Sequence, residues 1–345
     1  MRSWTRRLGT TALIAVALVS LLALPADAAH ATESDRSRDA TADGAFLFPA
    51  AGTTSYADAG SVTLSWDPGS GTATDWRIRQ SVGDVDVNGE CDAAVLTAGA
   101  TFKASGTSLD VAGTIAHRCY QYAAWQADAQ PTDPPAFVSG PLRVLAPWDG
   151  SFDLFRSGVF STQRTFTWCV AASVQMMLNI SLGQRDHSRA DQKMYMGYAK
   201  RHDLYPPGSS ARGTDPQGWT EAINHFEGST GYHVVTSSSF RWAVQKAVKR
   251  LRLTGKPVGL IVAHSNHAWV MTGFSATADP AATTGYSVTA VYILGPLYPR
   301  QQQYGYDMPP DTRVSYERLR AFLTPYADTV LPSNPWQHLY VTVEP

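Results

Sequence analysis

The spacing of hydrophobic residues changes near residue 145, and this change constrains the fold more than any other feature of the chain. Over residues 45–145, short segments alternate apolar and polar residues, as in "SVTLSWD", where Val62, Leu64 and Trp66 share one face. A spacing of two is typical of half-buried β-strands. After the connector "SGPLRVLAPWDG", apolar residues recur at helical spacing as well as in continuous strand-like runs. The chain is therefore predicted to hold an all-β sandwich followed by an α+β domain.

The predicted sandwich covers residues 45–145. Turn residues separate its segments and no helical period interrupts them, so about seven short strands are expected over these roughly 100 residues. The stretch resembles a fibronectin type III or immunoglobulin-like module, with Trp66 as a core aromatic residue and Tyr120 or Tyr122 near a late strand. The second domain is predicted to cover residues 146–345.

The first 28 residues have the pattern of a signal peptide. Arginines precede the apolar stretch "LGTTALIAVALVSLLAL", and "PADA" then offers Ala26 and Ala28 in a small-x-small cleavage pattern. We expect secretion by the Sec route, or by the twin-arginine route through Arg6-Arg7, and no membrane attachment after cleavage. Residues 29–44 are small and polar, which predicts a flexible leader.

Composition excludes several classes of protein. Hydrophobic residues make up 44% of the 345 residues and the formal net charge is −1, without a basic stripe or an acidic block. Such a chain can bury real cores, and it lacks the charge that binding to nucleic acid requires. This composition suits a globular protein that works on a neutral or varied partner. We expect a monomer with no cofactor, and a surface or polymer ligand for the sandwich domain.

The chain has three cysteines, and two of them lie in the predicted sandwich. In an oxidising compartment Cys91 and Cys119 are expected to pair, although two free buried thiols are the alternative. If they pair, Cys169 is a single thiol in the second domain. A single thiol in a secreted protein is either a liability or a reactive group.

Cys169 lies in "RTFTWCVAASVQMML", where apolar residues recur at helical spacing. This spacing predicts a helix from Cys169 to Leu182 that stops at Gly183. The unpaired amides and the dipole at the start of a helix favour a negatively charged sulfur. Gln163, six residues earlier, carries an amide that can donate a hydrogen bond to an oxyanion beside the sulfur.

Further helices and then strands follow. Helices are predicted at 186–200, from Pro216 with Asp215 as N-cap, at 239–253 and at 315–323, and strands at "PVGLIVA", "HAWVMTGF", "YSVTAVYIL" and "HLYVTV". His267 opens the second of these strands. A cysteine on an early helix and a histidine on a later strand is the arrangement that cysteine hydrolases need, because the imidazole takes the thiol proton and later protonates the leaving amine.

An ordered set of motifs carries a family resemblance. Gln163, Trp168-Cys169, "QMMLN", "GTDPQGWTEAINHF", "GKPVGLIV" and "HAWVMTGF" follow one another over roughly residues 155 to 300. In this order they resemble the papain-fold cysteine peptidases of the bacteriocin-processing, double-glycine type, in a secreted bacterial branch. The resemblance implies that Cys169 is the nucleophile, His267 the general base and acid, and Gln163 the oxyanion-hole donor. We therefore expect a peptide or protein substrate.

One position departs from that family. There the strand after the histidine usually ends in Asp-Pro, and the carboxylate orients the imidazole. This chain has Gly295-Pro296 at that place, so a backbone carbonyl, a water or a nearby polar side chain would have to replace the acid. The departure leaves a second hypothesis open, a papain-like protein that has lost turnover and acts in binding or adhesion.

Two further hypotheses receive less support. A cell-wall peptide hydrolase of the NlpC type would usually carry Asp-Cys-Ser at the nucleophile, and "WCVAAS" lacks it. A zinc site could begin with His264 and His267, but no third and fourth ligands are spaced to join them. We therefore predict no metal site.

Overall fold

The computed structural model describes residues 44–345, apart from 53, 70–72, 87–89, 131, 205–212, 301–306 and 329–332. The predicted signal peptide and leader lie outside the described residues, except for Gly44. Among the helices of the described part, none is both long enough and apolar enough to span a membrane.

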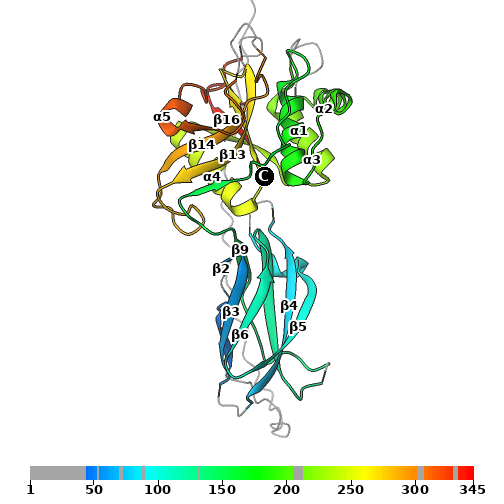
Figure 1. Cartoon of the computed structure of the whole chain (residues 1–345), viewed down its shortest axis with the longest axis vertical. Coiled ribbons are helices and arrows are strands. Elements are labelled where there is room, and N and C mark those ends of the chain that lie inside the picture. The colour runs from blue at the N-terminus through cyan, green and yellow to red at the C-terminus, as the bar shows by residue number, and fades with distance from the viewer. Residues whose placement is uncertain are drawn as a thin grey trace, which may run out of the picture. The chain divides into compact units, whose positions relative to one another are not determined.

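The described part of residues 45–145 is built mainly of strands, as the alternating pattern predicted, with one short 3₁₀ helix at Ala93–Val95. β1 (Ala45–Phe48), β3 (Gly60–Asp67) and β6 (Ser108–Thr114) form one sheet. The other sheet has the order β2 (Ser55–Asp58), β9 (Leu142–Leu145), β7 (Arg118–Gln126), β4 (Asp75–Asp84) and β5 (Thr97–Ser105), with β8 (Phe137–Val138) paired to β7. These strands are drawn in blue to green in Figure 1.

One core is built from both of these sheets. Val62, Leu64 and Trp66 alternate inward from β3, while Trp76 and Ile78 do the same from β4. Trp66 is 1% exposed, and its ring meets that of Trp76 edge-on at 6.4 Å between centroids. The large aromatic area buried here stabilises the packed sheets. The names sandwich, fibronectin type III and immunoglobulin-like stay predictions.

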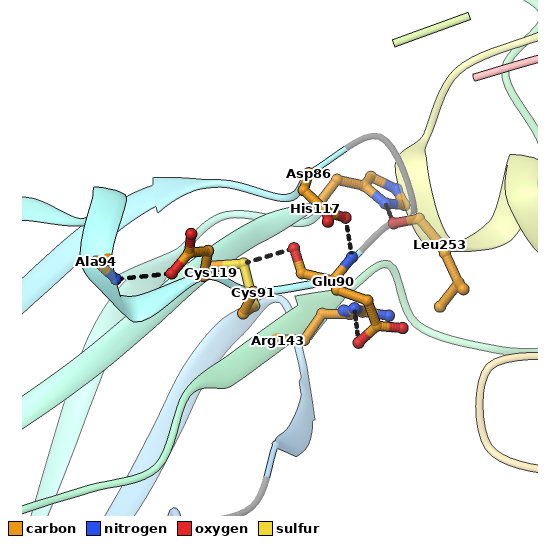
Figure 2. Close-up of a disulfide and its surroundings, with 9 residues drawn as sticks. Asp86, Glu90, Cys91, Ala94, His117, Cys119, Arg143 and Leu253 are labelled. Atoms are coloured by element: carbon orange, nitrogen blue, oxygen red, sulfur yellow. Dashed lines mark hydrogen bonds and ion pairs between the residues drawn. A yellow bond between two sulfur atoms is a disulfide. The ribbon is translucent and has the colours of Figure 1, made fainter. Parts of the chain in front are cut away.

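A disulfide joins Cys91 and Cys119, as predicted (Figure 2). Cys119 lies on β7, while Cys91 follows a loop that leaves β4. The N–H of Glu90 donates to Asp86 Oδ1 at 2.6 Å, and its carboxylate pairs with the buried Arg143 at 2.9 Å. Covalent and polar contacts together hold Glu90 and Cys91 against the sheet.

A third sheet, with seven strands, follows, and its pairs are antiparallel. Its order is β11 (His233–Ser237), β16 (Tyr340–Glu344), β12 (Val258–Val262), β13 (His267–Ala276), β14 (Val288–Leu294) and β15 (Thr312–Ser315), with β10 (Ser151–Asp153) paired to β13. The continuous apolar run of β12 is buried along its whole length, as expected for a strand covered on both faces.

Helices cover the two faces of this sheet (Figure 1). Ala268 and Val270 of β13 pack in one core with α1 (Cys169–Ser181), α2 (Arg189–Arg201) and α3 (Pro216–Glu227). Trp269 and Met271, which alternate with them, pack in another core with α4 (Phe240–Thr254) and α5 (Tyr316–Leu319). The period of two along β13 thus divides its side chains between two layers of helices.

Local signals located most of these elements. α3 begins with Asp215 as N-cap and Pro216 in its first turn, and α4 ends at Gly255, which has the left-handed φ of 65° typical of a helix C-cap. A helix was predicted at 315–323, but α5 spans only Tyr316–Leu319, and turns follow it. The short strands β10, β11 and β15 were not predicted.

Candidate active site

Cys169 is the first residue of α1, as its position in the sequence predicted. The helix that follows is buried from Val170 to Asn179, so packing on several sides holds its start in place. The N-cap residue Trp168 makes no side-chain capping hydrogen bond. The N–H groups of a first helical turn have no partner within the helix, and they therefore point positive charge toward the region of the Cys169 sulfur.

His267 is the first residue of β13, directly after a tight connection from β12. Ala263, His264 and Ser265 in this connection all have positive φ, between 53° and 74°. Such values strain residues other than glycine, and strained backbone is commonly found beside functional residues. The connection is held by two backbone groups, since the Ala263 N–H donates to the Phe322 carbonyl and the His264 N–H to the Thr324 hydroxyl.

Asp307 lies behind the imidazole of His267. The ring Nε2–H donates to Asp307 Oδ2 at 2.9 Å, and the N–H of Leu297 donates to the same oxygen at 2.7 Å. The indole N–H of Trp269 donates to Asp307 Oδ1 at 2.8 Å. Three donors thus hold a carboxyl side chain that is only 6% exposed, and the carboxylate in turn fixes the orientation of the ring.

Gly295 explains how Asp307 can reach this position. A Cβ added to Gly295 would overlap the Cβ and Cγ of Asp307. The space in which the family resemblance would place an acidic side chain is therefore filled by a carboxylate from elsewhere in the chain. The missing acid at residue 295 does not leave the imidazole without a partner.

Cys169 and His267 interact, and the interaction uses the other side of the ring. Burial lowers the pKa of His267, but its hydrogen bonds to Asp307 and Cys169 and the charges of both groups outweigh burial and raise it to about 9. Because Nε2 is bound to Asp307, Nδ1 is the ring nitrogen that remains for the sulfur of Cys169. An imidazolium beside a sulfur is the pair that a thiolate nucleophile requires.

Gln163 is buried directly beneath the loop that leads to Cys169. Its backbone N–H donates to the carbonyl of Pro296, and its side-chain nitrogen donates at 2.8 Å to the carbonyls of both Thr165 and Phe166. Both amide protons are thus in use. Gln163 is 1% exposed and is not among the residues that line the cavity described below.

A second buried glutamine, Gln192 of α2, supports the same loop. Its side-chain oxygen accepts the Arg164 N–H at 2.9 Å, and its nitrogen donates to the Thr162 carbonyl at 3.0 Å and to Gln175 of α1 at 2.8 Å. Gln163 and Gln192 together satisfy backbone groups on either side of Arg164. The loop before Cys169 is therefore held by Gln163 within it and by Gln192 from α2.

One cavity of about 420 Å³ brings the three residues together. Cys169, His267 and Asp307 all line it, and so do the apolar side chains of Trp269 and Phe322. A cavity of this volume is within the range of ordinary ligand sites. Within the part of the chain that the structure describes, no group of three or more His, Cys, Asp or Glu residues is arranged to hold a metal ion.

Sequence reasoning singled out Cys169 and His267, which the structure places in one cavity with Asp307, but it did not single out Asp307. Asp307 follows His267 by 40 residues, on a segment that showed no periodic pattern. One signal was present: Asp307 is the first acidic residue after Gly295, the position where an orienting acid was expected and absent.

Comparison with known proteins adds a family to this geometry. No curated protein and no solved structure matches the chain. The model of the Peptidase_C39 like family matches residues 159–321, and this match supports a C39-like cysteine peptidase family for the segment that carries Cys169, His267 and Asp307.

Proposed function

We propose that this protein is a secreted cysteine peptidase, or an amide hydrolase of the same mechanism, that acts on peptides through Cys169 and His267. The observation that carries the proposal is the arrangement around His267, which contacts Cys169 on one side and Asp307 on the other. The family match supports a peptidase-type chemistry for the same segment.

The proposed reaction has two halves. The Cys169 thiolate attacks the carbonyl carbon, and His267 gives its proton to the leaving amine as the C–N bond breaks, which leaves a thioester on the sulfur. His267 then takes a proton from water, and the hydroxide attacks the thioester. The carboxylic acid leaves, and the thiolate and imidazolium are restored.

The oxyanion of each tetrahedral intermediate needs donors. The Cys169 N–H belongs to the first turn of α1 and is one donor in this proposal. Gln163 remains the proposed second donor, as its family position implies. In the structure its amide protons bind the carbonyls of Thr165 and Phe166, so this role requires that one of these bonds be exchanged for the substrate oxygen.

A binding or adhesion protein without turnover is the competing hypothesis. Its main support in the sequence was Gly295, and the carboxylate of Asp307 now weakens that support. A cell-wall peptide hydrolase would use the same residues and differ only in its substrate.

For the strands of residues 45–145, we propose a fibronectin type III or immunoglobulin-like sandwich with a surface or polymer ligand.

Thiol labelling and peptide hydrolysis test the proposal together. Because Cys91 and Cys119 are joined, Cys169 is the one free thiol among the three cysteines of the chain. Iodoacetamide at mildly acidic pH should label the native protein at Cys169, and should label His267→Ala far more slowly because the imidazolium is lost. A panel of general and cell-wall peptides should be cleaved by the native chain and not by Cys169→Ala.

The outcomes separate the hypotheses. Slow labelling that matches the His267→Ala rate would overturn the proposed thiolate. Rapid labelling with no cleavage, and ligand binding that survives in Cys169→Ser, would favour the binding protein. Cleavage confined to cell-wall peptides would favour the narrower hydrolase.

A further inference from the structure

The cavity in front of Cys169 has mostly apolar walls. Besides Trp269 and Phe322, it is lined by the side chains of Val170, Ile261, Leu297 and Met308. The rings of Trp269 and Phe322 lie 4.8 Å apart and form a continuous surface. Such a wall favours a substrate with a bulky apolar side chain, because its burial removes apolar area from water.

The charged groups of this cavity are of two kinds. Cys169, His267 and Asp307 interact with one another, and both oxygens of Asp307 already accept hydrogen bonds. Arg318 also lines the cavity and is exposed. Among the described residues, no carboxylate forms an ion pair with Arg318. Among the charged groups that line the cavity, the guanidinium of Arg318 is therefore the one that can bind a charged group of a ligand.

Arg318 lies next to the apolar wall. It is on α5, four residues before Phe322, which lies in the turns that follow the helix, and both residues line the cavity. Arg320, two residues further along, instead places its guanidinium 5.2 Å from the ring centre of Phe240 and does not line the cavity. Two arginines on the same short segment thus have different surroundings.

We infer that Arg318 selects peptide substrates that carry a carboxylate close to a bulky apolar residue. The inference rests on the proposed peptidase function and adds its substrate class. A guanidinium binds a carboxylate through two parallel hydrogen bonds, and the apolar wall beside Arg318 can bury the neighbouring apolar side chain of the substrate. A lysine at the same substrate position is repelled. The carboxylate belongs to an Asp or Glu side chain or to a free C-terminus.

Matched fluorogenic peptides test the inference. Each carries one Phe and varies a neighbouring residue among Glu, Gln and Lys, and a second pair compares a free with an amidated C-terminus. The native chain should prefer Glu over Lys by about threefold to tenfold in kcat/KM, the range expected when an exposed arginine attracts one charge and repels the other. Arg318→Gln should remove the preference, Arg318→Glu should reverse it, and Arg320→Glu should leave it unchanged. The two peptide sets show whether Arg318 recognises a side-chain carboxylate or a free C-terminus.

A binding measurement keeps the test independent of turnover. The same peptides are titrated into Cys169→Ser, with and without Arg318→Glu, after equal melting temperatures have been verified. Equal affinities for the Glu and Lys peptides, or a preference that Arg318→Glu does not alter, overturn the inference. If peptides are neither cleaved nor able to protect Cys169 from labelling, the proposed function itself fails. If they are cleaved without charge preference, only the role of Arg318 fails.

Discussion

Asp307 occupies the space that a side chain on Gly295 would need, and from there it accepts the ring N–H of His267. The two positions exclude each other, because a Cβ at residue 295 and the carboxyl group of Asp307 would overlap. The small size of Gly295 is thus a condition for the hydrogen bond at His267. This relationship leads to the first two predictions.

Replacing Asp307 with Asn should lower kcat/KM by about 10²-fold. In serine triads loss of the acid costs on the order of 10⁴, and a preformed thiolate–imidazolium pair depends on it less. The amide keeps the shape of the side chain but removes the negative charge behind His267. Steady-state kinetics on one peptide gives the measurement, with the exposed Glu317→Gln as a control. A change of less than twofold would show that Asp307 is not needed to orient the ring.

Gly295→Ala should have a similar effect through a different route. Its methyl group would push the Asp307 carboxyl group away from His267, so kcat should fall while the fold persists. The matched control is Gly285→Ala, where the added Cβ would meet only the Thr283 hydroxyl at 3.5 Å. The double variant Gly295→Asp with Asp307→Gly should recover activity relative to Asp307→Gly alone. No recovery would mean that the acid is needed at Asp307 itself.

The pH–rate profile should have an alkaline limb near pH 9. The folded-state pKa of His267 is raised to about 9, so the imidazolium persists until the pH passes that value. In Asp307→Asn the limb should move to lower pH.

Because the folded pKa of His267 exceeds the usual 6.5, the stability that its charged form contributes is present below pH 6.5 and is lost as the pH rises through 9. Urea unfolding at pH 6 and pH 10, native against His267→Gln, measures that loss, and parallel curves for the two proteins would contradict it.

Gln163 and Gln192 form a pair of test variants. Replacing either with Leu leaves backbone groups of the 162–166 loop without partners, and each should destabilise the fold by about 1–3 kcal/mol. If Gln163 also donates to the oxyanion, Gln163→Leu should lower kcat by a further factor of about 10² with KM unchanged. Stopped-flow acylation and thermal melts separate the two effects. Equal kcat values for the two variants would assign Gln163 to the loop alone.

Removing the disulfide should lower the stability of the fold and leave the reactivity of Cys169 unchanged. Changing Cys91 and Cys119 to Ala removes a cross-link between residues 28 apart in sequence, which is worth about 2–4 kcal/mol. Neither residue lines the cavity of Cys169, so the labelling rate of that thiol should stay the same. A scanning-calorimetry melt and a labelling time course are the two measurements. A change in the labelling rate would reveal coupling between the strands of residues 45–145 and the site.

Local sequence determined the elements that carry Cys169 and His267, the proposed nucleophile and base. The helical spacing after Cys169 and the apolar run after His267 are short-range patterns, and α1 and β13 begin at those residues. The pairing of Cys91 with Cys119 also followed, because three cysteines leave few choices. The short edge strands β11 and β15 escaped prediction because they lack the continuous buried apolar run that marked the equally short β12.

Only the tertiary structure decided which carboxylate serves His267 and what Gln163 binds. Asp307 reaches the ring by a long-range contact that depends on the absence of a side chain at Gly295 and on donors from Trp269 and Leu297. Periodicity describes which face of an element is buried, and it says nothing about which loop will fill a space left by a glycine. Packing decides which segment fills that space, since two side chains cannot occupy the same volume. A buried carboxylate is also stable only where hydrogen-bond donors are available to it.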